Sequence, residues 1–343
     1  MSDQPVGVGL VGYGMSGSSV HAPLIGAEPR LRLRAVVSSD PDKVHRDLPS
    51  VPVVATVDEL FEDAAVELVV VAAPNAVHHE LAAAALRAGR HVVVDKPFTV
   101  TSAEADELIA LAGRQDRLLG VFHQRRWDSD FLTVERCVRD DVLGHVSTYV
   151  ARYDRFRPEP VVRWREEDGP GAGLLYDLGS HLIDQALHLF GIPETVSADV
   201  RAQRPGAVAD DYFHLVLGYG SLRVILHAGS LVLAPGPRFD VHGDAGSYVT
   251  HGLDGQVAAL LAGRRPGEEG WGMDGGEGTL TTPEGTRRLD RVPGAYESFY
   301  REMAAAIRGE GPVPVPAGQA RDTIRVIECA LLSSRDGRVV AVR

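Results

Sequence analysis

The sequence predicts an α/β protein of two domains. Residues 1–123 are expected to form a doubly wound parallel sheet, and residues 124–343 a domain built on an open, mainly antiparallel sheet. Three observations predict this fold. A glycine motif follows the first apolar run, almost wholly apolar segments then alternate with helical patterns, and after residue 123 the segments alternate apolar and polar residues. Buried parallel strands and half-exposed antiparallel strands differ in this way.

Composition narrows the class of protein. The chain has 343 residues, 44% of them apolar, which is enough for two hydrophobic cores. A formal charge of −12 argues against binding to nucleic acid. No run approaches the roughly 20 apolar residues that cross a bilayer, and the N-terminus lacks a signal peptide. Cys137 and Cys329 lie too far apart to suggest a disulfide framework or a metal motif. We expect a cytoplasmic protein without a membrane or nucleic-acid partner.

The first strand, Val6–Val11, leads into GYGMSG at residues 12–17, a G-x-G-x-x-G motif, and then into a helix that ends near residue 27. Gly12 permits a tight turn, Gly14 lets the backbone approach a pyrophosphate, and Gly17 lets the helix pack on the strand. The helix N-terminus offers N–H groups to the anion. The motif therefore predicts a dinucleotide site, with a plain glycine turn as the alternative.

The second strand, Leu31–Val37, ends beside residues that discriminate between cofactors. Ser38 and Ser39 are small hydroxyl residues and Lys43 follows closely, which favours the 2′-phosphate of NADP. Asp40 argues for NAD, because a carboxylate can bind ribose hydroxyls and repel a phosphate. Lys43 can also be simply a solvated helix charge. We expect NADP, with NAD left open.

The rest of the first domain continues the alternation. Thr101 and Glu104 form a capping-box sequence at one helix start. Asn75 can cap the helix that follows it, residues 76–88, and can also face a bound ribose. His78 lies in the first turn of that helix and can touch the cofactor or be merely part-exposed. The expected strands are residues 51–55, 67–73, 91–94 and 118–122, and the main helices are residues 76–88 and 101–114.

The segment HVVVDKPF, residues 91–98, places a lysine at a strand end. Pro97 fixes its own φ and keeps Lys96 out of the α region. Open α/β sheets bind ligands at the carboxyl ends of their strands. A lysine desolvated there can take part in proton chemistry, because burial lowers its pKa. The alternative is a lysine that ends a strand in solvent.

The second domain begins with His123-Gln124-Arg125-Arg126-Trp127-Asp128, a polar and aromatic segment expected to form a site wall. A glycine-rich segment, residues 263–278, is expected to be a mobile loop, and PVPVP at residues 312–316 an extended linker. The expected helices are residues 130–140, 174–190, 296–308 and 319–333, and the expected strands are residues 146–154, 195–202, 212–218, 222–228, 239–242 and 248–251.

Helix 174–190 carries the most suggestive polar pattern. Asp177, His181, Asp184 and His188 recur at i, i+4, i+7 and i+11 on an otherwise apolar helix. Asp177 can orient the ring of His181 as a base, and with a nicotinamide and Lys96 nearby this set suits alcohol oxidation. We expect Asp184 and His188 to be structural. Zinc is the rival ligand, but neither H-E-x-x-H nor cysteine ligands are present, so we expect no metal.

Several of these motifs together resemble those of a known protein family. The glycine motif, Pro74-Asn75 with His78, Asp95-Lys96-Pro97 and the Asp177-x-x-x-His181 helix resemble the Gfo/Idh/MocA oxidoreductases. Longer segments are similar to the NADP-dependent scyllo-inositol 2-dehydrogenases of that family: RRWDSDFLTV (125–134), RWRE (163–166), LYDLGSHLIDQALHLFG (175–191) and DDYFHL (210–215). The similarity covers nearly the whole chain.

The resemblance implies an NAD(P)-dependent dehydrogenase of a cyclic polyol or sugar. It implies that His181 accepts the proton, that Lys96 contacts the substrate hydroxyl and the cofactor, and that Asp177 tunes both. The residues expected to bind cofactor are Gly12, Tyr13, Gly14, Met15, Ser16, Gly17, Ser38, Ser39, Lys43, Ala73, Pro74, Asn75, His78, Asp95, Lys96 and Trp164. Those expected to bind substrate are His123, Trp127, Tyr153, Arg163 and His181.

The resemblance also implies a homodimer or homotetramer that pairs through the open sheet. Two departures stand out: relatives usually have glutamate where this chain has Asp95, and NADP-using relatives often have arginine where it has Asp40. Two alternative functions stay open. One is a dehydrogenase of an aldose or dihydrodiol, because single pocket contacts shift preference by only about 1–3 kcal/mol. The other is a regulator that binds dinucleotide without turnover.

Overall fold

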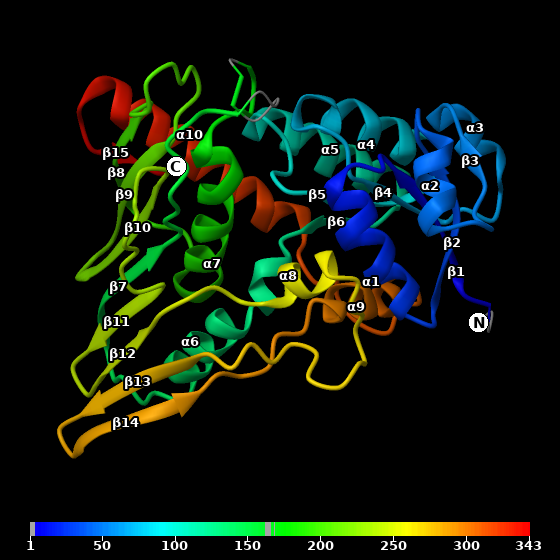
Figure 1. The fold of residues 1–343 in the computed structure, drawn as a ribbon. Coiled ribbons are helices and arrows are strands. Elements are labelled where there is room, and N and C mark those ends of the chain that lie inside the picture. The colour runs from blue at the N-terminus through cyan, green and yellow to red at the C-terminus, as the bar shows by residue number, and fades with distance from the viewer. Residues whose placement is uncertain (1–3, 162–165, 168) are drawn as a thin grey trace. The chain divides into compact units, whose positions relative to one another are not determined.

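The computed structural model describes residues 4–161, 166–167 and 169–343 and divides into two compact units (Figure 1). Unit 1 comprises residues 1–124, 256–271 and 295–321. Unit 2 comprises residues 125–255, 272–294 and 322–343. Each unit is therefore assembled from three separate stretches of chain.

Unit 1 contains a six-stranded parallel sheet with the strand order β3-β2-β1-β4-β5-β6. The order reverses between β1 and β4, which is where doubly wound sheets bind ligands. Strands β1 and β4 are buried along their whole lengths, as the apolar runs predict. The strands are β1 (Val6–Val11), β2 (Leu31–Val37), β3 (Val53–Val54), β4 (Leu68–Val71), β5 (His91–Asp95) and β6 (Leu119–Phe122).

Some helices of unit 1 begin where the local sequence supplies a side-chain cap. Thr101 accepts the N–H of Glu104, and the Glu104 side chain returns to the Thr101 N–H, which confirms the predicted capping box. Thr56 caps α3 in the simpler way. The helices are α1 (Ala22–Ala27), α2 (Pro41–Asp47), α3 (Val57–Glu62), α4 (His78–Arg87), α5 (Ser102–Gln115), α8 (Gln256–Leu261) and α9 (Glu297–Ile307), and the N-terminal turns of α10 (Ala317–Asp336).

Unit 2 is built on a nine-stranded sheet with the order β14-β13-β12-β11-β7-β10-β9-β8-β15. Every described pairing is antiparallel except that of β7 with β10, which confirms a mainly antiparallel sheet. In β9 buried and half-exposed residues alternate, as period-two patterning requires. Helices α6 (Ser129–Arg139) and α7 (Ser180–Phe190) pack on one face of this sheet (Figure 1).

The strands of that sheet are β7 (Val146–Arg152), β8 (Thr195–Arg201), β9 (Tyr212–Tyr219), β10 (Leu222–Gly229), β11 (Phe239–Gly243), β12 (Ser247–Thr250), β13 (Glu277–Thr282), β14 (Gly285–Asp290) and β15 (Val340–Ala341).

The structure corrects three sequence predictions. Helix α8 and the hairpin β13–β14 were not predicted, since their short segments lack strong periodicity. The glycine-rich loop ends at Glu277, where β13 begins, and the Trp271 indole N–H anchors it by donating to Glu297 at 2.8 Å. PVPVP is extended but is more than a linker, because the carbonyl of Val315 accepts the N–H of Val121 in β6 at 3.1 Å.

Candidate functional site

The glycine turn after β1 has the backbone geometry that its motif predicts. Gly12 has φ +97°, and a Cβ there would lie 2.6 Å from the carbonyl oxygen of Ala72. A Cβ on Gly17 would lie 2.2 Å from the carbonyl oxygen of Gly12. Only glycine fits at either position. By contrast, a Cβ on Gly14 would meet no atom of the described residues within 4 Å, so this side of the turn leaves space for a ligand to approach.

A cavity of about 410 Å³ opens beside this turn, at the carboxyl ends of β1 and β2. Its size suits the nucleoside half of a dinucleotide. It brings together the glycine turn and several of the other residues predicted to bind cofactor. Its lining includes Gly12, Tyr13, Gly14, Ser38, Ser39, Asp40, Lys43 and Ala73.

Asp40 has a structural role in this cavity wall. Its carboxylate accepts the backbone N–H of Lys43 at 3.0 Å and so caps α2. The backbone N–H of Asp40 in turn donates to the hydroxyl of Ser38 at 3.1 Å. One carboxylate oxygen is therefore used by the helix rather than offered to a ribose.

At the end of β4, His78 joins two strand ends. It is 1% exposed, and its Nδ1 and Nε2 each lie 2.9 Å from a carbonyl oxygen, of Pro97 and Ala73 respectively. His78 thus connects the segment after β4 to the segment after β5. Asn75 is also buried, in the 3₁₀ turn Asn75–Val77 that precedes α4.

Asp95 connects the glycine turn to Lys96. The hydroxyl of Ser16 donates to one carboxylate oxygen at 2.6 Å, and the backbone N–H of Lys96 donates to the other at 2.8 Å. Burial alone would raise the pKa of Asp95, but His21, Ser16 and the charge of Lys96 outweigh it and hold the pKa well below its usual range. Asp95 is thus a buried, permanently ionised carboxylate. Lys96 is half-buried and precedes a cis bond to Pro97.

In unit 2 the predicted helix 174–190 begins with a π-helical turn, Leu175–Gly179, before α7. Four residues cover less than one turn of a π-helix, so the predicted i, i+4 alignment of Asp177 with His181 is altered there. Asp177 lies 3.5 Å from the guanidinium of Arg155, and His181 is 3% exposed. Asp210 anchors this turn by accepting the N–H of Leu175 at 2.7 Å.

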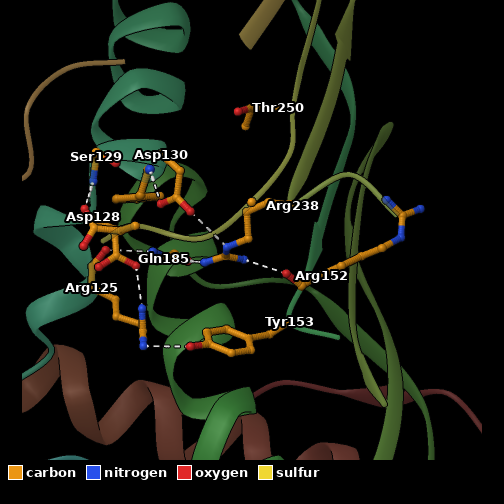
Figure 2. A network of polar contacts seen from close by, with 12 residues as sticks. Arg125, Asp128, Ser129, Asp130, Arg152, Tyr153, Gln185, Arg238 and Thr250 are labelled. Carbon is orange, nitrogen blue, oxygen red and sulfur yellow. Dashed lines mark hydrogen bonds and ion pairs between the residues drawn. The ribbon is translucent and has the colours of Figure 1, made fainter. Parts of the chain in front are cut away.

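Tyr153 lies in a network of buried charges in unit 2 (Figure 2). Its hydroxyl accepts from Arg125 at 2.9 Å, and the same guanidinium donates to Asp128 at 2.9 Å. Arg238 lies 5.5 Å from the centre of the Tyr153 ring. Two arginines therefore fix a tyrosine that the sequence predicts to bind substrate.

Arg238 is the centre of that network. It is 2% exposed, donates to Asp130 at 3.2 Å and to Gln185 at 3.2 Å, and also donates to the carbonyl of Arg152 (Figure 2). Burial and the neighbouring Asp128 raise the pKa of Asp130 to about 6, although Arg238 opposes this. One guanidinium thus holds together α6, α7 and the end of β7.

Comparison with known proteins assigns the chain to a family. Residues 6–123 match the oxidoreductase family with an NAD-binding Rossmann fold, and residues 135–342 match the C-terminal α/β domain of the same family. The chain belongs to the Gfo/Idh/MocA oxidoreductases.

Its relatives match over almost their whole lengths. The uncharacterised oxidoreductase YdgJ of Escherichia coli is 48% identical over 98% of each chain. The scyllo-inositol 2-dehydrogenase (NADP(+)) IolW of Bacillus subtilis is 44% identical over 97% of this chain and 95% of its own. The solved structure of the oxidoreductase yvaA from Bacillus subtilis has a TM-score of 0.97 at 42% identity and covers 100% of both chains.

As a Gfo/Idh/MocA member, the protein is an NAD(P)-dependent dehydrogenase that acts on CH–OH groups. The residues of unit 1 fit such a cofactor: the turn is open at Gly14, and a nucleoside-sized cavity with hydroxyl and lysine side chains adjoins it. In the described ranges no helix is long and apolar enough to cross a membrane. Those ranges also contain no group of three His, Cys, Asp or Glu side chains that could hold a metal.

Other predicted site residues of this Gfo/Idh/MocA chain lie where their strands end. His123 is buried directly after β6, and Trp127 ends the 3₁₀ turn Gln124–Trp127. Met15 is 56% exposed. Pro74 is exposed directly before the 3₁₀ turn that contains Asn75. Arg163 and Trp164 lie outside the described residues.

The two remaining polar residues of helix α7 pair with other helices of unit 2. Asp184 accepts two hydrogen bonds from Arg126, at 2.9 and 2.7 Å, and both side chains are buried. His188 lies 2.8 Å from Glu135 of α6. These pairs are consistent with the structural roles expected for them.

The sequence prediction missed His21, Arg238 and Tyr300, although it placed Arg125 in the expected site wall. His21 is a lone histidine in an apolar helical segment, and that pattern usually means a satisfied core residue. The side-chain partners of Arg238 lie 53 and 108 residues away, so no local pattern marks this arginine.

Proposed function

We propose that this dehydrogenase acts on a secondary hydroxyl of a cyclic polyol such as scyllo-inositol, or on the matching ketone, and prefers NADP. The observation that carries the proposal is the full-length 44% identity to a protein named scyllo-inositol 2-dehydrogenase (NADP(+)). Identity at this level over the whole chain includes both the cofactor domain and the substrate domain.

The cavity wall after β2 supports the preference for NADP. Ser39 adds a hydroxyl and Lys43 a positive charge to this wall, while one carboxylate oxygen of Asp40 is engaged by the N–H of Lys43 and the hydroxyl of Ser38 by the backbone of Asp40. A 2′-phosphate is better matched by hydroxyl donors and a cation than by a free carboxylate.

When bound, the nicotinamide exchanges a hydride with the substrate carbon. We assign three side chains to the accompanying proton chemistry. An imidazole nitrogen of His181 takes the hydroxyl proton during oxidation. The Nζ of Lys96 donates a hydrogen bond to the same substrate oxygen and stabilises its developing negative charge. Asp177 keeps His181 oriented, and Arg155 is near enough to limit the movement of the Asp177 carboxylate.

Substrate hydroxyls are assigned to the residues that the sequence predicts, among them Tyr153 and Trp127. Tyr153 is held by Arg125 on its hydroxyl and by two guanidinium groups near its ring. Such a rigid phenol suits the recognition of a ring-shaped polyol, because little side-chain entropy is lost on binding.

The open face of the nine-stranded sheet is assigned to subunit pairing. Val150, Ile225 and Val216 are aligned across β7, β10 and β9 on this face, and Ile225 and Val216 remain half-exposed. A row of apolar residues on one sheet face is typical of a homo-oligomer interface. Ile225→Glu is expected to reduce the mass measured by light scattering to that of a smaller species.

The deciding experiment is turnover with NADP and with NAD against scyllo-inositol, myo-inositol and several aldoses. We expect the highest kcat/KM with scyllo-inositol and NADP. A higher kcat/KM with an aldose would replace the substrate assignment. Cofactor binding without turnover of any substrate would favour the regulator.

Two variants test the assigned chemistry. Lys96→Ala and His181→Ala are each expected to lower kcat by on the order of 10²–10⁴. Near-normal turnover in either variant would remove that residue from the mechanism. Fluorescence titration with NADP serves as the control, because both variants should still bind the nucleoside and phosphates.

A further inference from the structure

A chain of buried polar groups lies beneath the Lys96 turn in unit 1. His21, the last residue of the π-helical turn Gly17–His21, is 0% exposed. Its Nδ1 lies 2.6 Å from the hydroxyl of Tyr300 in α9. Its Nε2 faces the carboxylate of Asp95 at 3.6 Å and, within the described part of the chain, has no hydrogen-bond partner. None of the functions assigned above uses this imidazole.

The surroundings of His21 keep water out. Its ring lies 4.3 Å from the ring of Phe122, centre to centre, and Phe299 packs edge-on to Phe122 at 4.9 Å. Tyr300, Phe122 and Phe299 are fully buried. In such an apolar setting a misplaced proton is costly, because no solvent can satisfy the group left without a partner.

The donors and acceptors around His21 favour one tautomer of its ring. Burial and the charge of Asp95 raise the pKa of Tyr300 well above its ordinary value, so its phenol keeps its proton. The only described acceptor of that proton is the Nδ1 of His21. The ring proton then belongs on Nε2, where it points at Asp95. The opposite tautomer would place a nitrogen lone pair against an ionised carboxylate.

We propose that Tyr300 and His21 are positioning residues for the reaction, acting in the order Tyr300 hydroxyl, His21 imidazole, Asp95 carboxylate. The phenol fixes the imidazole, and the imidazole N–H stabilises the charge of Asp95. Asp95 then holds the backbone of Lys96 and the hydroxyl of Ser16 in place. No proton is transferred along this chain.

The inference rests on the proposed function, because it assigns Lys96 to the substrate oxygen. It also explains why α9, far away in sequence, is packed against the first helix of the nucleotide-binding sheet. The ionisable groups that face Asp95 are His21, Lys96 and Tyr300, and Ser16 adds a neutral donor.

The first test does not need turnover. In protein labelled with ¹⁵N-histidine, the His21 resonance is identified by its loss in His21→Gln. We expect the ring proton of His21 on Nε2, and a change in its Nδ1 shift in Tyr300→Phe. An imidazole protonated at Nδ1 would overturn the proposal, whatever the substrate of the enzyme.

The second test is kinetic and uses Tyr300→Phe, which removes one oxygen. We expect kcat to fall about three- to tenfold, the effect of losing one buried hydrogen bond. The Kd for NADP should change less than threefold. The KM for the polyol should also change less than threefold, because the substrate-binding residues are untouched and the loss therefore lies in kcat.

Tyr149→Phe is the matched control, since Tyr149 is equally buried, lies in unit 2, and its hydroxyl has no hydrogen-bond partner among the described residues. It should retain the wild-type kcat and KM. An unchanged kcat in Tyr300→Phe would overturn the proposal. So would a loss of kcat accompanied by an equal loss of NADP affinity or a matching rise in KM, because that pattern indicates a purely structural role. Absence of turnover in the wild type would refute the proposed function, while the tautomer test would still decide this inference.

Discussion

The glycine turn of unit 1 and the arginine network of unit 2 form their candidate sites in opposite ways. The turn works through backbone: Gly12 and Gly17 leave no room for a Cβ, and Gly14 leaves space for a ligand. The network works through long side chains, with Arg238 joining Asp130, Gln185 and a backbone carbonyl (Figure 2). The spacing of the glycines marks the turn in the sequence, although Ala72, which excludes a Cβ at Gly12, directly follows β4. The partners in the charge network carry no such local mark.

The largest effect is expected from Arg238→Met in the network. The substitution keeps much of the side-chain volume but leaves Asp130 buried without its guanidinium. We expect the free energy of unfolding to fall by about 3–5 kcal/mol, as for other buried ion pairs that lose one partner. Urea denaturation measures this.

Arg288→Met is the control, because Arg288 forms an ion pair with Glu277 while its side chain is 81% exposed. This variant should lower the free energy of unfolding by at most about 0.5 kcal/mol. If the two variants were equally stable, the network would contribute no more than a surface pair, and the contrast with the glycine turn would disappear.

In the glycine turn, one glycine should matter for stability and another for NADP binding. Gly17→Ala forces a Cβ against the Gly12 carbonyl, so we expect a loss of about 1–3 kcal/mol of stability. Gly14→Ala meets no protein atom, so its stability should be near wild type while its affinity for NADP falls. Thermal unfolding and fluorescence titration on both variants test this. Equal NADP affinity of wild type and Gly14→Ala would show that the open side of the turn is not where the cofactor approaches.

Asp210, beside the π-helical turn of unit 2, makes stability depend on pH. Burial raises the pKa of Asp210 to about 6, above its ordinary value of 3.8. Between these values the unfolded chain has lost this proton and the folded chain still holds it, so this carboxyl's contribution to stability falls as pH rises from about 4 to 6.

Asp210→Asn removes this ionisation. The free energy of unfolding of the variant should therefore rise relative to that of the wild type as the pH increases from about 4 to 6, by about 1–3 kcal/mol. Chemical denaturation at pH 4, 5, 6 and 7 measures the difference. Asp58→Asn, at an exposed position, serves as the control. A difference between Asp210→Asn and wild type that stayed constant with pH would show that Asp210 ionises normally in the fold.

The smallest effect is expected at Lys43, on the rim of the nucleotide cavity. Lys43→Ala should weaken NADP binding about three- to tenfold and leave NAD binding within twofold, because a part-exposed cation adds roughly 1 kcal/mol to a phosphate contact. The ratio of the two dissociation constants is the measured quantity. A ratio that does not change would place the 2′-phosphate, if NADP is used, away from this lysine.

The first domain was easier to predict than the second, because the signals that mark its elements are local in the sequence. Its strands are apolar throughout, its glycines sit at fixed offsets, and Thr101 and Glu104 cap a helix within four residues. Every one of these signals is local. The hairpin β13–β14 was missed because its strands are short and mostly exposed, so they carry little apolar alternation.

The sequence by itself determined the class of fold, the glycine turn, and which residues stand at the ends of β4 and β5. Steric limits on φ and the burial of apolar strands act over a few residues, so they can be recognised without coordinates. The tertiary structure alone decided that Tyr300 meets His21 and that Arg238 meets Asp130. Hydrogen bonds and ion pairs are short-ranged and directional, so their partners are known only once the chain has brought distant residues within about 3 Å.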